Sequence, residues 1–114
     1  MTEALVEAGA CGFKTVIRAK KEKESLVDGT IHITIGSACK DIMALAKELN
    51  GTRPNVEFLT PMIKNIVLND ASKYLKCTDC AVPWSILKAV KVEMGFALPK
   101  DVSVKFSKEP EKKS

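Results

Sequence analysis

The chain carries four cysteines, and their types and spacing are the features most able to do chemistry. Cys77 and Cys80 form a Cys-x-x-Cys pair, whereas Cys11 and Cys39 are isolated in the sequence. Such a pair is the usual way in which one segment supplies two thiolates to a tetrahedral metal site. The two isolated cysteines complete the site only if the fold brings them to the pair. We therefore expect Cys11, Cys39, Cys77 and Cys80 to be the ligands of one metal site.

Thiolate is a soft ligand that selects zinc, copper(I) or iron–sulfur clusters, and an all-sulfur set fits zinc or an iron–sulfur cluster best. The three closely spaced cysteines of ferredoxins are missing, so an iron–sulfur cluster would be held by ligands gathered from distant elements. The choice between zinc and a cluster stays open. Three other interpretations stay open: ordinary buried thiols, disulfides, and a redox dithiol formed by Cys77 and Cys80. Asp79, inside the pair, is a candidate further ligand or hydrogen-bond acceptor.

Most enzymatic signatures are missing from the chain. It has no glycine-rich phosphate loop, no dinucleotide fingerprint and no nucleophile elbow, and its single histidine is His32. We expect His32 to be a surface residue on the polar face of a strand. The sequence therefore favours a carrier, a scaffold or an accessory protein over a stand-alone enzyme.

The composition is that of one ordinary globular domain, with 114 residues, 46% hydrophobic and 28% charged. A chain of this size does not need a metal to fold, since stapled domains are usually shorter than about 70–80 residues. The formal charge of +4 arises from 18 basic and 14 acidic residues with mixed signs, which argues against nucleic-acid binding. A protein partner is the expected kind of partner, and the oligomeric state stays open.

The first residues are acidic where a secretory signal would be basic, and no apolar run approaches the ~20 residues of a membrane span. We therefore expect a cytoplasmic protein without a membrane partner. Thiols in that compartment stay mostly reduced, which favours metal or redox use of the cysteines over structural disulfides.

Two segments have the period of a β-hairpin. Residues 30–35 place isoleucine at every second position, and residues 13–19 alternate less regularly on the other side of a charged loop that ends at Asp28-Gly29. One face of the second strand carries Ile31, Ile33 and Ile35. Further strands are expected at residues 102–106 and, less clearly, at 4–8.

Two segments have the period of amphipathic helices. Residues 38–49 follow Ser37, the expected N-cap, so that Cys39 lies in the first turn. Residues 83–95 begin at Pro83, and Trp84 lies off the apolar stripe, where it is either a core aromatic or an exposed contact of a protein-interaction module. Residues 61–75 are a weaker helix that Asn69-Asp70 could divide, and residues 52–60 are expected to be irregular or briefly extended.

These elements predict an α+β fold. Residues 1–106 form a single globular domain with a three- to four-stranded antiparallel sheet and helices packed on one face, and residues 107–114 form a flexible polar tail. Hairpin partners run antiparallel, so Cys11, before one strand, and Cys39, after the other, should be neighbours. Cys80 joins them if its helix lies beside the Cys39 helix and runs in the same sense.

The chain resembles an uncharacterised family of small prokaryotic proteins over about residues 4–105. The motifs that carry the resemblance are Cys11-Gly12-Phe13, Ser37-Ala38-Cys39, and the run from Cys80-Ala81-Val82-Pro83 to Ala97-Leu98-Pro99-Lys100-Asp101-Val102. The resemblance implies that histidine often replaces Cys77, an exchange that a metal ligand allows. It implies no particular reaction.

A second resemblance is to the IscU/NifU-type iron–sulfur assembly scaffold. It rests on Ala10-Cys11-Gly12, on Cys39 at a helix start, and on Cys80 followed by Leu87-Lys88-Ala89. Two features depart from that scaffold: Phe13 stands where it has an aspartate, and Ala81 follows Cys80 without the scaffold's His-Cys dipeptide. The resemblance implies cluster binding, and these departures remove the ligand that makes such a cluster labile.

Overall fold

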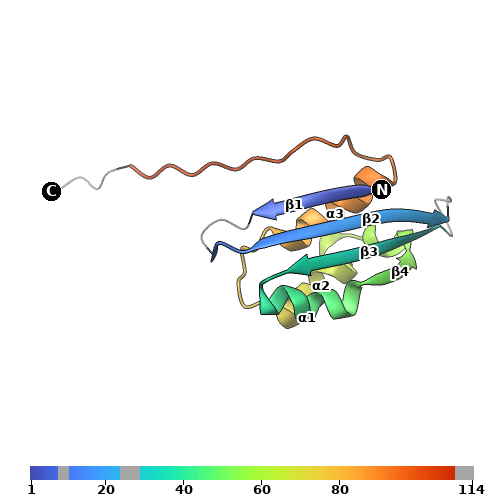
Figure 1. Ribbon diagram of the computed structural model, residues 1–114, viewed down its shortest axis with the longest axis horizontal. Helices are drawn as coiled ribbons and strands as arrows, with labels where there is room; N and C mark the ends of the chain where they lie inside the picture. Colours follow the sequence, from blue (N-terminus) through green and yellow to red (C-terminus); the bar gives the residue numbers. More distant parts are fainter. Residues whose placement is uncertain (8–10, 24–28, 110–114) are drawn as a thin grey trace.

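The structure is a computed structural model that describes residues 1–7, 11–23 and 29–109 (Figure 1). Within these residues, four strands form one antiparallel sheet in the order β1-β2-β3-β4. The strands are β1 (Thr2–Glu7), β2 (Lys14–Lys23), β3 (Thr30–Ser37) and β4 (Gly51–Pro54). Residue 8 of the first expected strand, Asp28 of the expected turn and the end of the expected tail lie outside the described residues.

The predicted α+β class and antiparallel sheet are confirmed. Alternation decides which face is buried: Ile31, Ile33 and Ile35 of β3 and Ile17 of β2 all point to one side and are buried. The hairpin of β2 and β3 is longer than expected, because each strand continues past the predicted boundaries into polar residues. The fourth strand is β4, in the region expected to be irregular or briefly extended.

The predicted strand at residues 102–106 is wrong. These residues have no regular secondary structure, and Val102, Val104 and Phe106 are 50%, 65% and 94% exposed. The alternation of apolar and polar residues is present, but a strand also needs a partner. β4 takes the edge beside β3, and no element of the described chain pairs with residues 102–106.

Three α-helices cover the buried face of the sheet, with α1 against β3 and α3 against β1 and β2 (Figure 1). They are α1 (Lys40–Leu49), α2 (Ile66–Tyr74) and α3 (Val82–Glu93), and α2 packs between the other two. No helix in the described part of the chain is long and apolar enough to cross a membrane. The observed α1 begins two residues later than the predicted helix at 38–49. The observed α3 begins one residue earlier than the predicted helix at 83–95 and ends two residues earlier.

The predicted helix at 61–75 is divided, but at Asn65 rather than at Asn69-Asp70. The short 3-10 helices η2 (Asn55–Phe58) and η3 (Met62–Lys64) precede α2. Buried Asn65 accepts hydrogen bonds from the backbone N–H groups of Val67 and Leu68, and its amide donates to the carbonyls of Phe58 and Thr60. This side chain is both the N-cap of α2 and the link from α2 to η2.

Glu93, the last residue of α3, fixes the direction of that helix over the sheet. Its carboxylate accepts hydrogen bonds from the Thr2 hydroxyl and from the Lys21 backbone N–H, both at 2.9 Å. Thr2 begins β1 and pairs with Ala19 of β2, so α3 ends at this end of the sheet. The helix therefore begins at the opposite end, where β1 finishes and β2 starts.

We predict that Ile33→Ala lowers the free energy of unfolding by about 2–5 kcal/mol, because it leaves a cavity between the sheet and the helices. Denaturant unfolding followed by circular dichroism measures this loss. Thr34→Val, one residue away on the open face, is the matched control and should stay within about 0.5 kcal/mol of the parent. Equal losses in the two variants would show that the two faces of the sheet are not distinguished.

We also predict an acid-dependent contribution from Glu93. Partial burial alone would raise the pKa of Glu93, but hydrogen bonds from Lys21 and Thr2 and the nearby N-terminal ammonium hold it below its ordinary value of 4.5. A depressed pKa in the folded state stabilises the fold above about pH 4.5, and this stabilisation is lost as the pH falls through the folded value.

Glu93→Gln should therefore be less stable than the parent at pH 7, and the difference should shrink as the pH falls below 4.5. Thermal melts of both proteins between about pH 3 and 7 measure this. A difference that stays constant across the range would show that Glu93 acts through packing alone.

Candidate functional site

The hairpin register places the segments of Cys11 and Cys39 at the same end of the sheet. Thr15 of β2 pairs with Ser37 of β3, and the Thr15 hydroxyl donates to the Ser37 hydroxyl at 2.9 Å. Cys11 lies shortly before Thr15, and Cys39 lies two residues after Ser37. The chain therefore enters and leaves the hairpin beside one point.

Cys39 is the N-cap of α1, which corrects the expectation that Ser37 caps a helix with Cys39 inside its first turn. The Cys39 carbonyl accepts the backbone N–H of Met43 at 3.0 Å, while the Ser37 hydroxyl accepts the N–H of Cys39 itself at 3.1 Å. Ser37 thus shapes the turn that precedes the helix. Cys39 thus stands at the positive end of α1, and its side chain makes no capping hydrogen bond.

Cys80 stands at the start of α3. The backbone N–H of Val82, the first residue of the helix, donates a hydrogen bond to the Cys80 sulfur. Since α3 ends at the Thr2 end of the sheet, its first turn lies at the end where the hairpin segments of Cys11 and Cys39 meet. Both helix starts are therefore at the same end of the domain, as Figure 1 shows.

Asp41 binds the segment before Cys77 to the end of the sheet where α1 begins. The Asp41 carboxylate, in the first turn of α1, accepts the backbone N–H of Lys76 at 3.4 Å. Lys76 directly precedes Cys77, so the Cys-x-x-Cys segment passes over the start of α1. No local sequence pattern marks this role of Asp41, because it depends on a contact between residues 35 positions apart.

The electrostatic surroundings of Cys80 include the other three thiols. Burial raises the pKa of Cys80, and the thiols of Cys11, Cys39 and Cys77 raise it further because their negative charges oppose a thiolate there. The hydrogen bond from Val82 acts in the opposite sense. Cys80 is therefore close enough to each of the other three thiols to sense its charge.

The thiols are gathered but do not form a closed coordination site. None of the four forms a disulfide with another; Cys11 and Cys77 are exposed, whereas Cys39 and Cys80 are partly buried and pack against the core. Across residues 1–7, 11–23 and 29–109, no three cysteine, histidine or acidic side chains stand close enough to hold one metal ion. Shared coordination by Cys11, Cys39, Cys77 and Cys80 stays a prediction, as does the role of Asp79.

His32 lies away from these thiols on the open face of the sheet. Its ring nitrogen Nδ1 is 3.1 Å from the Thr52 hydroxyl and 3.6 Å from a carboxylate oxygen of Glu22. The side chain is 44% exposed, which agrees with the expected surface position.

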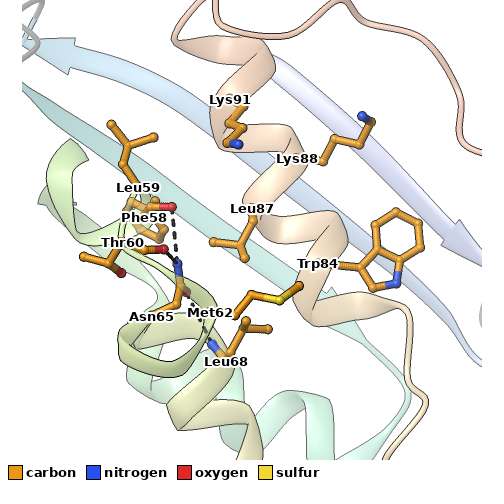
Figure 2. Close-up of a pocket in the computed structure, with 10 residues that line it drawn as sticks. All are labelled: Phe58, Leu59, Thr60, Met62, Asn65, Leu68, Trp84, Leu87, Lys88 and Lys91. Carbon is orange, nitrogen blue, oxygen red and sulfur yellow. Dashed lines mark hydrogen bonds between the residues drawn. The ribbon is translucent and has the colours of Figure 1, made fainter.

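Apart from the thiols, the domain has a groove between α3 and the segment from η2 to α2, and none of the cysteines lines it (Figure 2). It is an open groove of about 310 Å³. Its walls are mainly apolar, and lysines stand on α3 at one side; the lining residues are Phe58, Leu59, Thr60, Met62, Asn65, Leu68, Trp84, Leu87, Lys88 and Lys91. The sequence pattern did not identify this groove, because its walls come from segments far apart in the chain, one of them the weak helix expected at residues 61–75.

A protein-family model, described as a family of unknown function (DUF6951), matches residues 2–106. The chain belongs to this family. The match spans all four cysteine positions and agrees with the predicted membership of an uncharacterised family. The comparison with curated proteins and the comparison with solved structures each found no match.

We predict that Cys11→Ser lowers the pKa of Cys80, because it removes one of the like charges that oppose the Cys80 thiolate. The pKa should stay above its ordinary value of 9.0, since burial is the larger cause. The rate of alkylation of Cys80 as a function of pH, followed by peptide mass spectrometry on metal-free protein, measures this value.

Ala38→Ser is the matched control, because it introduces the same hydroxyl at an exposed position of the same end of the domain without removing a thiol. It should leave the titration of Cys80 unchanged. If Cys11→Ser also leaves it unchanged, Cys11 does not belong to the thiol cluster.

Proposed function

We propose that this protein is a small cytoplasmic metal-binding protein, in which Cys11, Cys39, Cys77 and Cys80 hold zinc or an iron–sulfur cluster. It acts as a carrier, a scaffold or an accessory protein for a protein partner. The observation that carries the proposal is the convergence of three separate segments on one end of the sheet, so that the thiol of Cys80 senses the other three.

Charge balance supports a cation at this place. Four thiolates in one neighbourhood repel one another, and a soft metal or a cluster compensates that repulsion while selecting sulfur over oxygen ligands. The starts of α1 and α3 add positive dipole ends beside Cys39 and Cys80. The protein thus offers a soft, negatively charged donor set with favourable backbone surroundings.

The core supports a transferable metal over a purely structural one. Buried hydrophobic residues from the sheet and all three α-helices already form one cluster, to which Cys39 and Cys80 contribute only partly buried side chains. Two of the four thiols are exposed. A site at the surface of an already complete core is suited to release its metal to a partner, whereas a structural zinc site is closed.

The likeness to the IscU/NifU-type scaffold makes the iron–sulfur version of the proposal specific. What supports it is the order of Cys11, Cys39 and Cys80 and the place of Cys39 at the start of α1. Phe13 in place of the scaffold's aspartate opposes it, because a labile ligand is missing. Metal analysis decides between this version and zinc.

A thiol oxidoreductase that uses Cys77 and Cys80 is less well supported. That hypothesis needs the start of α3 to stabilise a thiolate, and the thiol at that position is Cys80. Burial and the neighbouring thiols raise the pKa of Cys80, which opposes thiolate formation. Reversible cycling of the pair near cytosolic potentials would reinstate the hypothesis.

Metal content and the ultraviolet–visible spectrum of protein purified without oxygen test the proposal. Sulfur-to-iron absorption in the visible range identifies a cluster, and stoichiometric zinc without colour identifies zinc. Cys39→Ser should reduce uptake of the identified metal by at least about tenfold, because it removes a ligand that the fold presents at the start of α1. Protein with four reactive thiols and neither metal, even after reconstitution, would refute the proposal.

Ala38→Ser again serves as the control and should bind metal like the parent. Stability separates ligation from packing. At a free metal concentration of about 100 times the dissociation constant, binding stabilises the parent by about 2.7 kcal/mol. Cys39→Ser should lack that gain, and without metal it should differ from the parent only as a small, partly buried substitution does.

A further inference from the structure

The chain ends in a segment, residues 96–109, that leaves the domain; we call it the arm. It follows α3 through Gly95, whose φ of +83° lies in the left-handed region that glycine adopts readily. Within the part of the chain that the structure describes, no hydrogen bond or ion pair attaches residues 101–109 to the domain. Figure 1 shows the arm running along the β1 side and then beyond it.

The arm has the pattern of a strand with one apolar face. Val102, Val104 and Phe106 alternate with Ser103 and Lys105, and all three apolar side chains are at least half exposed. A period of two places them on one side of an extended chain. The match to the family extends to residue 106, so this apolar face is part of the family's domain.

The sheet has an unpaired edge that fits such a strand. β1 is at one edge of the described sheet, paired only with β2, and its six residues, TEALVE, contain no proline. The other edge, β4, has four residues and ends at Pro54. Exposed edge strands present unpaired backbone groups that accept a further strand, and proline and short length prevent this. β1 is therefore the receptive edge.

The helix α3 could cover a strand added outside β1. One side of α3, near Leu87, faces α2 and η2. Trp84 and Lys88 belong to the rim of the same groove, but their side chains project from the other side of α3 than the one that faces Phe58 and Leu59 (Figure 2). Trp84 is 40% exposed. Because α3 packs on β1, a strand added outside β1 would lie below this side of the helix, with its apolar face toward Trp84.

We propose that two copies of this chain exchange arms, so that residues 102–106 of each copy form a strand beside β1 of the other. The donor strand and the receptive edge occur on the same chain, so one twofold exchange pairs both at once and closes the assembly. In the single chain the arm runs beyond β1 rather than pairing with it. The side chains of Val102, Val104 and Phe106 then pack against the Trp84 side of the partner's α3.

Light scattering on the full-length protein tests the exchange, in reducing buffer with a chelator so that neither disulfides nor a shared metal can join two copies. The parent should be a dimer, and Val104→Asp should be a monomer with an unchanged far-ultraviolet circular dichroism spectrum. Ser103→Asp is the matched control: it adds the same charge on the other side of the strand, and it should remain a dimer.

Trp84 provides a second readout, because it is the single tryptophan of the chain. Its fluorescence emission should shift to longer wavelength in Val104→Asp and not in Ser103→Asp. A parent protein that is monomeric overturns the proposal. If the parent is monomeric and the tryptophan emission still shifts in Val104→Asp, the arm of each chain covers the β1 edge of that same chain. A dimer that survives Val104→Asp overturns it as well. None of these outcomes depends on whether the thiols bind metal.

Discussion

The register between β2 and β3 is the constraint on which the rest of the structure depends. The pleat has a period of two, so a slip of one residue would turn Ile31, Ile33 and Ile35 toward solvent. Burial of these side chains therefore excludes such a slip, and in the observed pairing Thr15 meets Ser37. The same pairing brings the entry and the exit of the hairpin together. Core packing thus positions the thiol cluster, although the cysteines themselves contribute little to the core.

Opposing electrostatic demands distinguish this end of the domain from the rest. Charging several thiols together is unfavourable, and partial burial adds to the cost at Cys80. The helix starts and the N–H of Val82 offset part of it. The fold therefore holds Cys80 near the other thiols at the expense of its own ionisation, and a pKa perturbed in this way is more typical of functional sites than of ordinary cores.

The local sequence pattern was sufficient to predict the strands and helices that bury one face. The isoleucines of β3 and the stripe of α3 predicted their elements to within a few residues, because burial and period agree there. Pattern failed where pairing is a long-range matter: residues 102–106 alternate like a strand but pair with none of the residues that the structure describes. It also failed at Asn65 and Asp41, whose roles depend on contacts with segments that no local period specifies. The segments of Cys11 and Cys39 follow from local pattern, because antiparallel pairing of β2 and β3 fixes their end of the sheet.

Asn65 has a consequence for how substitutions are tolerated in related chains. Its amide accepts two backbone N–H groups and donates to two carbonyls, so both halves of the group are in use. Aspartate would keep the acceptors and lose the donors, serine would lack the second function, and glutamine would carry the amide one methylene too far. Asparagine is the single side chain that meets all these demands at this depth. Its presence at the equivalent position would therefore identify the same junction, and with it the same groove, in a sequence of otherwise low similarity.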